Sequence, residues 1–448
     1  MVNQSDKEEV IVIGLGYVGL TLSAYLASIG MSVHGVEVRD AVLSDLGKHK
    51  AFFLEENLDE MLDIVIKNKS FSFSKFIPNS KNKRTFIITV GTPLTENQMP
   101  NLDFIVRAAT EVANVLNDND LVILRSTVKL GVTNSIVRPI LNSSNKKIGL
   151  AFCPERTLEG SALSEIGFLP QIIGADSEED LKRATIFFGK VTNNVVQVSN
   201  IETAEMIKLV DNMQRDTHFA VSNEVARMCN QVNVKASEVI AAGKNNYPRT
   251  NLPTPGPVGG PCLEKDTYLL NESFTLPFSL SKTARMVNEA IISDSLDYFK
   301  TYFGNRISKR QPVFRIAVIG LAFKGVPETN DLRGSMALRV ITSIREEFDN
   351  VEICGYDPVV MEKEIIDLKI QFAKTYAQAS ENTDLVLLMN NHPKISEIKL
   401  DLVASKMKSE GMIYDYWGRF DNVKDLPNKV VMSSWGSHGT SIDGKLNG

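Results

Sequence analysis

Residues 10–20 read VIVIGLGYVGL, an apolar run that passes through three closely spaced glycines into a segment with helical periodicity. The order is strand, glycine turn and helix. A second apolar segment, 31–36, ends at Glu37, about twenty residues after the glycines, as in dinucleotide-binding βαβ units. In such units the glycines let the backbone approach the pyrophosphate, and the helix N-terminus favours its negative charge.

This turn predicts both the cofactor and its contacts. Glu37 would accept hydrogen bonds from the adenosine ribose hydroxyls and repel a 2′-phosphate, so we expect NAD, not NADP. Arg39 could accept a phosphate, but we interpret it as a solvent-facing side chain. The residues expected to contact the dinucleotide at this turn are Gly14, Gly16, Tyr17, Val18, Gly19 and Glu37.

Further apolar segments at 85–90, 121–124 and 148–153 each lead into a polar loop. Their alternation with helical stretches such as 103–115 predicts a mainly parallel, doubly wound sheet, whose ligands bind at the carboxyl ends of the strands. Thr92, Thr127 and Glu155 should therefore line one crevice, in which Thr92 and Thr127 are expected to contact the cofactor. Strands at 171–174 and 194–198 should complete this domain near residue 200.

The pattern then changes to helices at 201–232, 236–242 and 278–302. The first of these is long and carries more apolar residues than one neighbour can cover, which makes it a candidate dimer interface. On its early turns Lys208 and Asn212 share a face.

A strand at 314–320, a loop, a helix from Ser335 and a strand at 351–357 repeat the N-terminal order without the three glycines. Lys324 and Arg333 in that loop suit an anionic nucleotide other than the dinucleotide. We therefore expect an α/β protein with two Rossmann-like, doubly wound domains joined by a central helical region, divided as 1–200, 201–305 and 306–448. The residues from Gly436 onward should form a flexible tail.

One thiol stands out in the central region, where residues 256–266 read GPVGGPCLEKD. A helix beginning at Pro261 or Cys262 would favour the thiolate through its unpaired N–H groups and dipole, and Lys265 would add a cation. Asp266 would share a face with Cys262 and could hold or activate a water. The alternative is that Cys262 is a buried, inert structural thiol.

Composition limits the class of protein. The 448 residues suggest two or three domains, and the net charge of −5 argues against a nucleic-acid partner. No apolar run is long enough to cross a bilayer, and the N-terminus lacks the apolar region of a signal peptide. Because the cysteines form neither a CxxC pair nor a zinc pattern, we expect no metal and a reducing, cytoplasmic location. The cysteines are Cys153, Cys229, Cys262 and Cys354.

Several motifs together resemble the UDP-glucose/GDP-mannose dehydrogenase family of nucleotide-sugar 6-dehydrogenases over nearly the whole chain. They are GLGYVGL, GTPL, STV, CPERTLEG, the Lys208 to Asn212 pair, VGGPCLEKD, GLAFK and NDLRGS. The resemblance implies an N-terminal NAD domain, a central helical dimerisation region and a C-terminal domain for the UDP-sugar.

It also implies oxidation of the sugar C6 alcohol to a carboxylate, with two hydride transfers to NAD, in the synthesis of surface polysaccharide precursors. Cys262 would form a thiohemiacetal and then a thioester. Lys208 and Asn212 would stabilise the oxyanion, and Asp266 would orient the hydrolytic water. Glu155 would be the acid/base residue, acting directly or through a water held by Thr127.

Family positions further imply contacts with substrate and cofactor. Glu159 would lie near the nicotinamide and the sugar, and Arg333 would reach NAD. Several family members take the arginine at the position of Arg249 from the neighbouring subunit of a dimer. The substrate-binding positions are Glu155, Glu159, Lys208, Asn212, Arg249, Gly259, Phe323 and Lys324.

The sequence contains motifs typical of two different branches of the family. CPER and the stretch YPRTN at 247–251 look like UDP-N-acetylhexosamine dehydrogenases, whereas Glu159-Gly160 and CLEKD look more like UDP-glucose dehydrogenases. The PGPGVGGHC of the first branch lacks one glycine here, and Pro261 replaces its histidine. We expect a UDP-N-acetylhexosamine, GlcNAc or ManNAc, with UDP-glucose as the alternative. A single-step alcohol dehydrogenase and a non-enzymatic nucleotide-sugar sensor are the competing functions.

Overall fold

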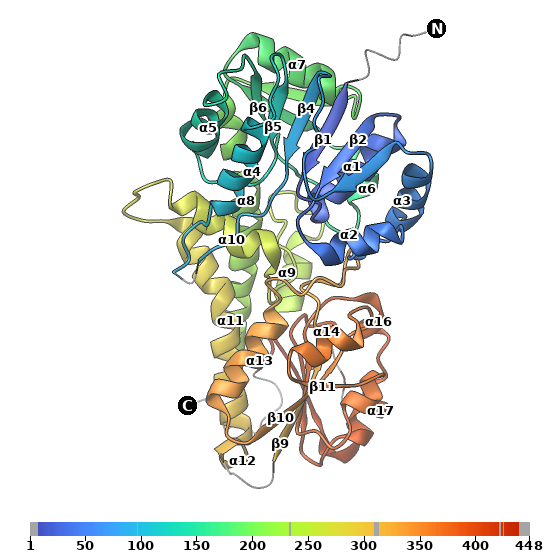
Figure 1. The fold of residues 1–448 in the computed structure, drawn as a ribbon. Helices are drawn as coiled ribbons and strands as arrows, with labels where there is room; N and C mark the ends of the chain where they lie inside the picture. The colour runs from blue at the N-terminus through green and yellow to red at the C-terminus, as the bar shows by residue number, and fades with distance from the viewer. Residues whose placement is uncertain are drawn as a thin grey trace. The chain divides into compact units, whose positions relative to one another are not determined.

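The computed structural model describes residues 8–95, 97–232, 234–308, 313–420, 423 and 425–438 (Figure 1). Contacts divide the chain into two compact units. Unit 1 holds the described residues up to Asn212 together with Lys265–Leu276, and unit 2 holds Met213–Glu264 and the described residues from Pro277 onward. The division into functional domains at residues 200 and 305 stays a prediction.

Unit 1 is built on a sheet that, in the part of the chain described, has the strand order β3-β2-β1-β4-β5-β6-β7-β8. Neighbouring strands are parallel except β6 and β7, which are antiparallel. The strands are β1 Glu9–Ile13, β2 Ser32–Val36, β3 Phe71–Ser74, β4 Arg84–Ile88, β5 Leu121–Leu124, β6 Gly149–Phe152, β7 Gln171–Ala175 and β8 Val195–Val198.

Helices cover both faces of this sheet. Val10 and Val12 of β1 enter one hydrophobic core with Leu20 of α1, whereas Ile11 of β1 enters another with Ile105 of α4. This alternation puts a core on each side of the sheet and confirms the doubly wound prediction. The helices are α1 Tyr17–Ser28, α2 Asp40–Gly47, α3 Leu58–Lys67, α4 Asp103–Ala113, the π-helical η2 Thr133–Val137, α5 Arg138–Asn142, α6 Ala162–Ile166 and α7 Glu178–Phe188.

Unit 2 contains the second parallel sheet, with strand order β11-β10-β9-β12-β13-β14. Its strands are β9 Phe314–Ile319, β10 Val351–Tyr356, β11 Gln371–Phe372, β12 Leu385–Leu388, β13 Met412–Asp415 and β14 Val431–Ser434. Around them lie the helices α13 Met336–Glu347, α14 Glu362–Asp367, α15 Tyr376–Ala379, α16 Pro393–Ser396, α17 Leu400–Lys406 and the short 3₁₀ turn η3 Pro427–Lys429.

The first βα turn has the same hydrogen-bonding arrangement in both sheets. Gly14 follows β1 with φ +92°, and Gly320 follows β9 with φ +91°. In unit 1 the Leu15 N–H donates to Glu37 at 3.1 Å, and in unit 2 the Leu321 N–H donates to Asp357 at 2.6 Å. An acidic residue after the second strand therefore fixes the turn after the first strand in both units, which confirms the predicted second nucleotide-domain-like unit.

The predicted central helices are present as α8 Ile201–Asn230, α9 Ala236–Lys244, α10 Gly260–Asn271, α11 Leu280–Phe303 and the short α12 Asn305–Ser308. α8 and α11 are long helices (Figure 1). Within unit 2, Ile291, Leu296 and Phe299 of α11 share one hydrophobic core with Ile316 of β9. In the part of the chain described, no helix combines the length and apolar character needed to cross a membrane.

The prediction of a flexible tail from Gly436 is wrong for Gly436–His438. Gly436 accepts a hydrogen bond from the Ala236 N–H at 3.0 Å, and the buried His438 ring stacks on Tyr298 at 3.9 Å. Burial lowers the pKa of His438 to about 3, so its imidazole is neutral. Residues 439–448 lie outside the described part of the chain.

Candidate active site

The glycine turn after β1 combines close backbone packing at Gly19 with an open position at Gly16. A Cβ on Gly19 would lie 1.9 Å from the Gly14 carbonyl oxygen, so this glycine is needed for α1 to pack on the strand. A Cβ on Gly16 would meet nothing within 4 Å, so the space in front of it is open. α1 begins at Tyr17 with no side-chain cap, and the N–H groups of Tyr17, Val18 and Gly19 suit a pyrophosphate. These residues fit NAD, which accepts hydride when bound.

Glu37 lies at the end of β2 and is buried. Its carboxylate accepts hydrogen bonds from the Leu15 and Arg39 N–H groups and pairs with the Arg39 guanidinium at 2.8 Å. Burial raises the pKa of Glu37, but Arg39 and the N–H donors outweigh burial and hold the pKa below its usual value. Arg39 is exposed, in keeping with its interpretation as a solvent-facing side chain, but its guanidinium also pairs with Glu37, which the sequence did not indicate.

Thr92 and Thr127 lie in contact, while the crevice that they were predicted to line together with Glu155 stays a prediction. The Thr92 hydroxyl donates to the Thr127 carbonyl at 2.6 Å and accepts from the Lys265 ammonium at 2.9 Å. Lys265 also lies 3.2 Å from the Asp266 carboxylate. The sequence interpretation used Lys265 as a cation for the thiol of Cys262. The structure instead places its ammonium on Thr92 and Asp266.

Glu155 follows β6 and is held in a buried ion pair. The Arg125 guanidinium donates to its carboxylate at 2.6 and 3.1 Å, and the Arg156 and Thr157 N–H groups donate at 2.7 and 2.8 Å. Burial raises the pKa of Glu155, but Arg125 and these N–H groups bring it below its usual value. A carboxylate with a lowered pKa is a weak base, and the acid/base role of Glu155 stays a prediction.

The loop that carries Glu159 is fixed by a buried carboxylate that sequence reasoning missed. Glu55 accepts hydrogen bonds from the Gly160 N–H at 2.8 Å and from the Leu163 N–H at 3.1 Å. Glu159 itself is half-buried. Nothing in the sequence pairs Glu55 with this loop, because the two segments lie far apart along the chain.

Lys208 and Asn212 lie one turn apart on α8, and both are nearly buried. The Asn212 side-chain amide donates to the Asp266 carboxylate at 2.5 Å. Asp266 is fully buried, so this bond replaces one that the carboxylate would make with water. Among the described residues the Lys208 ammonium has neither a hydrogen-bond nor an ion-pair partner. A nearly buried cation beside an amide donor suits an oxygen that becomes negative during a reaction.

Cys262 lies in the first turn of α10, which begins at Gly260, close to the predicted start. Its side chain is exposed, whereas Cys153 and Cys229 are buried. Burial raises the pKa of Cys153 to about 12, so that thiol stays protonated. The alternative that Cys262 is a buried structural thiol therefore does not fit its exposure.

The glycines before Cys262 approach other backbone and ring atoms of unit 2. A Cβ on Gly259 would lie 2.2 Å from the Gly334 carbonyl oxygen, and one on Gly260 would lie 2.5 Å from the Phe323 ring. Close packing thus requires glycine at both positions. The Lys324 ammonium lies over the Phe323 ring, 5.2 Å from its centre.

Two arginines of the predicted site also lie in unit 2. Arg333 pairs with Asp331 of its own loop at 2.7 Å, and more than half of its side chain is exposed. Arg249 is exposed, with its guanidinium 5.6 Å from the centre of the Tyr247 ring. The predicted contact of Arg333 with NAD and that of Arg249 with substrate stay predictions.

Comparison with known proteins covers most of the chain. Residues 8–192, 202–290 and 317–422 match the NAD-binding, central and UDP-binding domains of the UDP-glucose/GDP-mannose dehydrogenase family. A UDP-N-acetyl-D-mannosamine dehydrogenase from Pyrococcus horikoshii is 30% identical over 410 residues, which are 90% of this chain and 94% of that protein. The chain belongs to this family. It is an NAD-dependent nucleotide-sugar dehydrogenase, as the resemblance implied.

Other relatives and solved structures extend the comparison. An NDP-N-acetyl-D-galactosaminuronic acid dehydrogenase from Ralstonia nicotianae is 29% identical over 90% of this chain and 95% of that protein. The structure of the Pyrococcus horikoshii dehydrogenase has a TM-score of 0.84 at 28% identity and covers 96% of this chain and all of that one. A UDP-N-acetyl-mannosamine dehydrogenase from Staphylococcus aureus has a TM-score of 0.80 at 26% identity, covering 96% of this chain and 98% of that one.

Proposed function

We propose that this protein oxidises the C6 hydroxyl of a UDP-N-acetylhexosamine to the carboxylate, with NAD as the hydride acceptor, to give a UDP-uronic acid for surface polysaccharide synthesis. The observation that carries the proposal is the position of Cys262. It is an exposed thiol in the first turn of α10, and one turn later the same helix carries the buried Asp266 bonded to Asn212.

The overall change removes four electrons from the alcohol carbon. Loss of one hydride and one proton gives an aldehyde. The Cys262 thiolate adds to the aldehyde carbon, and the oxygen takes up one proton to give a thiohemiacetal. Loss of a second hydride and the hydroxyl proton leaves a thioester. Water then attacks the thioester carbonyl, the C–S bond breaks, and the products are the carboxylate, the free thiolate and two protons.

The residues of unit 1 support these steps in different ways. The Lys208 ammonium and the remaining N–H of the Asn212 amide would stabilise the oxyanions that form when sulfur or water adds to the carbonyl carbon. Asp266 would orient the hydrolytic water. Its carboxylate is held by Asn212 and Lys265, so its position is already set before substrate binds.

The choice of sugar rests on the relatives. Those compared above are named for N-acetyl-D-mannosamine and N-acetyl-D-galactosaminuronic acid substrates, and they support an N-acetylhexosamine over UDP-glucose. Assays on UDP-GlcNAc, UDP-ManNAc, UDP-GalNAc and UDP-glucose should give the highest kcat/KM with an N-acetylated sugar. A preference for UDP-glucose would contradict this assignment.

The stoichiometry of NADH formation tests the reaction. With a limiting amount of the preferred UDP-sugar, we expect two NADH for each sugar consumed, since one thioester is formed and hydrolysed per turnover. The measurement combines absorbance of NADH with chromatography of the sugar nucleotide. One NADH per sugar would indicate a single-step dehydrogenase, and none across the sugar panel would indicate a sensor.

We also propose that the protein acts as a cytoplasmic homodimer. Unit 2 carries large exposed apolar side chains on α8, α9 and α11, of which Met286 is 69% and Met228 58% exposed. Side chains of this kind gain about 1.5–3 kcal/mol each when they are fully buried. A second copy covering these helices would also allow the exposed Arg249 to serve a neighbouring site. None of the four cysteines forms a disulfide, which supports a reducing compartment.

Light scattering on the purified protein at micromolar concentration should show a dimer and no monomer. Replacing Met228 and Met286 with glutamate should shift the equilibrium toward monomer and reduce activity, because a buried charge opposes association. A monomer that is fully active would contradict the dimer proposal.

A further inference from the structure

A group of fully buried polar side chains in unit 2 contacts the loop that leads to Cys262. It comprises Asp216 and Asn223 of α8 and Arg285 and Asn288 of α11, which we call the buried polar cluster. Their exposed fractions are 1%, 0%, 2% and 0%. Polar groups buried to this degree are costly unless each finds a partner, so their contacts indicate what they are for.

Asn223 binds the loop backbone at Gly256 in both directions. Its side-chain amide donates to the Gly256 carbonyl at 3.1 Å, and its side-chain oxygen accepts from the Gly256 N–H at 2.8 Å. Arg285 binds the same loop two residues further on, where its guanidinium donates to the Val258 carbonyl at 3.0 Å. The loop is thus held at two points just before the turn that carries Cys262.

The remaining contacts hold Asn223 and Arg285 in place. Asn288 accepts from the Asn223 amide at 2.8 Å and donates to the carboxylate and carbonyl of Asp216 at 2.8 and 2.9 Å. Asp216 in turn lies 3.0 Å from the Arg285 guanidinium. Each side chain that binds the loop is therefore fixed by a second buried group.

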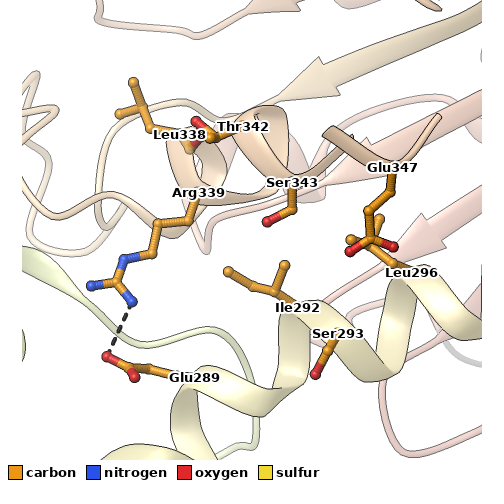
Figure 2. A pocket seen from close by; sticks show the side chains of 9 residues that line it. All are labelled: Glu289, Ile292, Ser293, Leu296, Leu338, Arg339, Thr342, Ser343 and Glu347. Carbon is orange, nitrogen blue, oxygen red and sulfur yellow. Dashed lines mark hydrogen bonds and ion pairs between the residues drawn. The ribbon is translucent and has the colours of Figure 1, made fainter. Parts of the chain in front are cut away.

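Ion pairs at the protein surface also contact α10, the helix that carries Cys262. Arg339 of α13 pairs with Glu264 of α10 and with Glu289 of α11. Figure 2 shows the Arg339 to Glu289 pair at one end of a cavity of about 440 Å³ between α11 and α13. About a third of each of these side chains is exposed, and ion pairs in contact with water contribute little. The buried polar cluster is the stronger constraint on the loop.

Stability alone does not account for this cluster. Apolar residues of similar volume are often as stabilising as a buried ion pair or more so, whereas directional hydrogen bonds define one position of the groups they join. The segment they bind is rich in glycine and proline, and residues 255–258 are buried, so its backbone groups need partners within the protein. We propose that Asn223 and Arg285 are positioning residues that hold the backbone at Gly256 and Val258, so that Cys262 is presented to substrate in one fixed position. The inference rests on the role of Cys262 in the proposed function.

The test compares variants of the full-length protein. Asn223→Ala removes both hydrogen bonds to Gly256. Arg285→Lys keeps a positive charge beside Asp216 but lacks the second guanidinium nitrogen, which donates to the Val258 carbonyl. The control is Tyr416→Phe, which removes the buried hydrogen bond between Tyr416 and Ser295 in the same unit without touching the loop. All three variants should melt below the parent.

Only the two cluster variants should affect Cys262. We expect kcat to fall about 10²-fold with little change in the KM for NAD, because misplacing a reacting group by about 1 Å costs this much. Alkylation of Cys262 by iodoacetamide without substrate, followed by peptide mass spectrometry, should also be slower, since the thiol loses its fixed place at the helix N-terminus.

The alkylation rate decides the inference independently of activity. If both cluster variants fold and alkylate at the rate of Tyr416→Phe, the cluster is only structural and the inference is wrong. If Asn223→Ala does not fold, Arg285→Lys carries the same expectation. Should the parent form no NADH from any UDP-sugar, the proposed function fails, but a slower alkylation of Cys262 in the variants still supports the positioning role.

Discussion

Replacing Cys262 with serine is expected to abolish NADH formation from the UDP-sugar while leaving the binding of NAD and UDP-sugar intact. Serine is nearly isosteric, so the exposed first turn of α10 should keep its conformation. A neutral hydroxyl is a far poorer nucleophile than a thiolate at pH 7, and we expect turnover to fall at least about 10³-fold. Cys262→Ala should behave in the same way.

The measurement is NADH formation under saturating substrates, with calorimetry to follow binding of each ligand. Cys354→Ser is the matched control, since it makes the same chemical change at a half-buried cysteine in β10, and it should keep near-parent rates. If Cys262→Ser still releases two NADH per sugar at close to the parent rate, the covalent mechanism is wrong.

Asp266→Asn is expected to slow hydrolysis of the thioester more than its formation. The Asp266 carboxylate is fully buried and is held by Asn212 and Lys265. The amide of asparagine would lose the negative charge that pairs with Lys265 and could present N–H groups to the Asn212 amide, and it could no longer take a proton from water. We expect turnover to fall about 10²- to 10⁴-fold, the usual contribution of a positioned acid or base.

Because formation of the thioester is less affected, a sugar adduct on Cys262 should accumulate and appear in intact-protein mass spectrometry. Asp120→Asn is the matched control, since Asp120 is also fully buried in unit 1 but precedes β5, whereas Thr127 follows the other end of this strand. This control should lose stability without accumulating an adduct. Unchanged hydrolysis in Asp266→Asn would exclude Asp266 from this step.

The fold could be predicted because its signals are local. Glycine spacing at 14–19, apolar runs and the acidic residue after the second strand are each read within a few tens of residues, and the structure has the strands where these signals place them. The strands β3 and β11 were not predicted, because with 4 and 2 residues they are too short to show a clear alternation of apolar and polar side chains.

Partners of the site residues could not be predicted in the same way. Glu55, Arg125 and Asn223 are polar residues, and in a single sequence they look like solvated side chains until the fold buries them. Lys265 was placed near the thiol from its position in the helix, yet its long side chain reaches Thr92. Contacts of this kind depend on tertiary structure, which helical or strand periodicity does not encode.

The tail prediction failed for a related reason. Gly436, Ser437 and His438 are small or polar, which is typical of a mobile terminus, but Tyr298 and Tyr414 provide an aromatic surface for the His438 ring. A stacking surface formed by residues distant in sequence outweighs local composition.

The contact between Trp435 and Asn223 can form only late in the synthesis of the protein. Trp435 donates from its indole N–H to the Asn223 side-chain oxygen at 3.3 Å, the same oxygen that receives the Gly256 N–H. Asn223 and Gly256 leave the ribosome well before Trp435, and domains fold as their residues emerge. While the chain is still being translated, Asn223 lacks this partner, and a transcript truncated before codon 435 would encode every proposed catalytic residue without the last contact that supports the loop of Cys262.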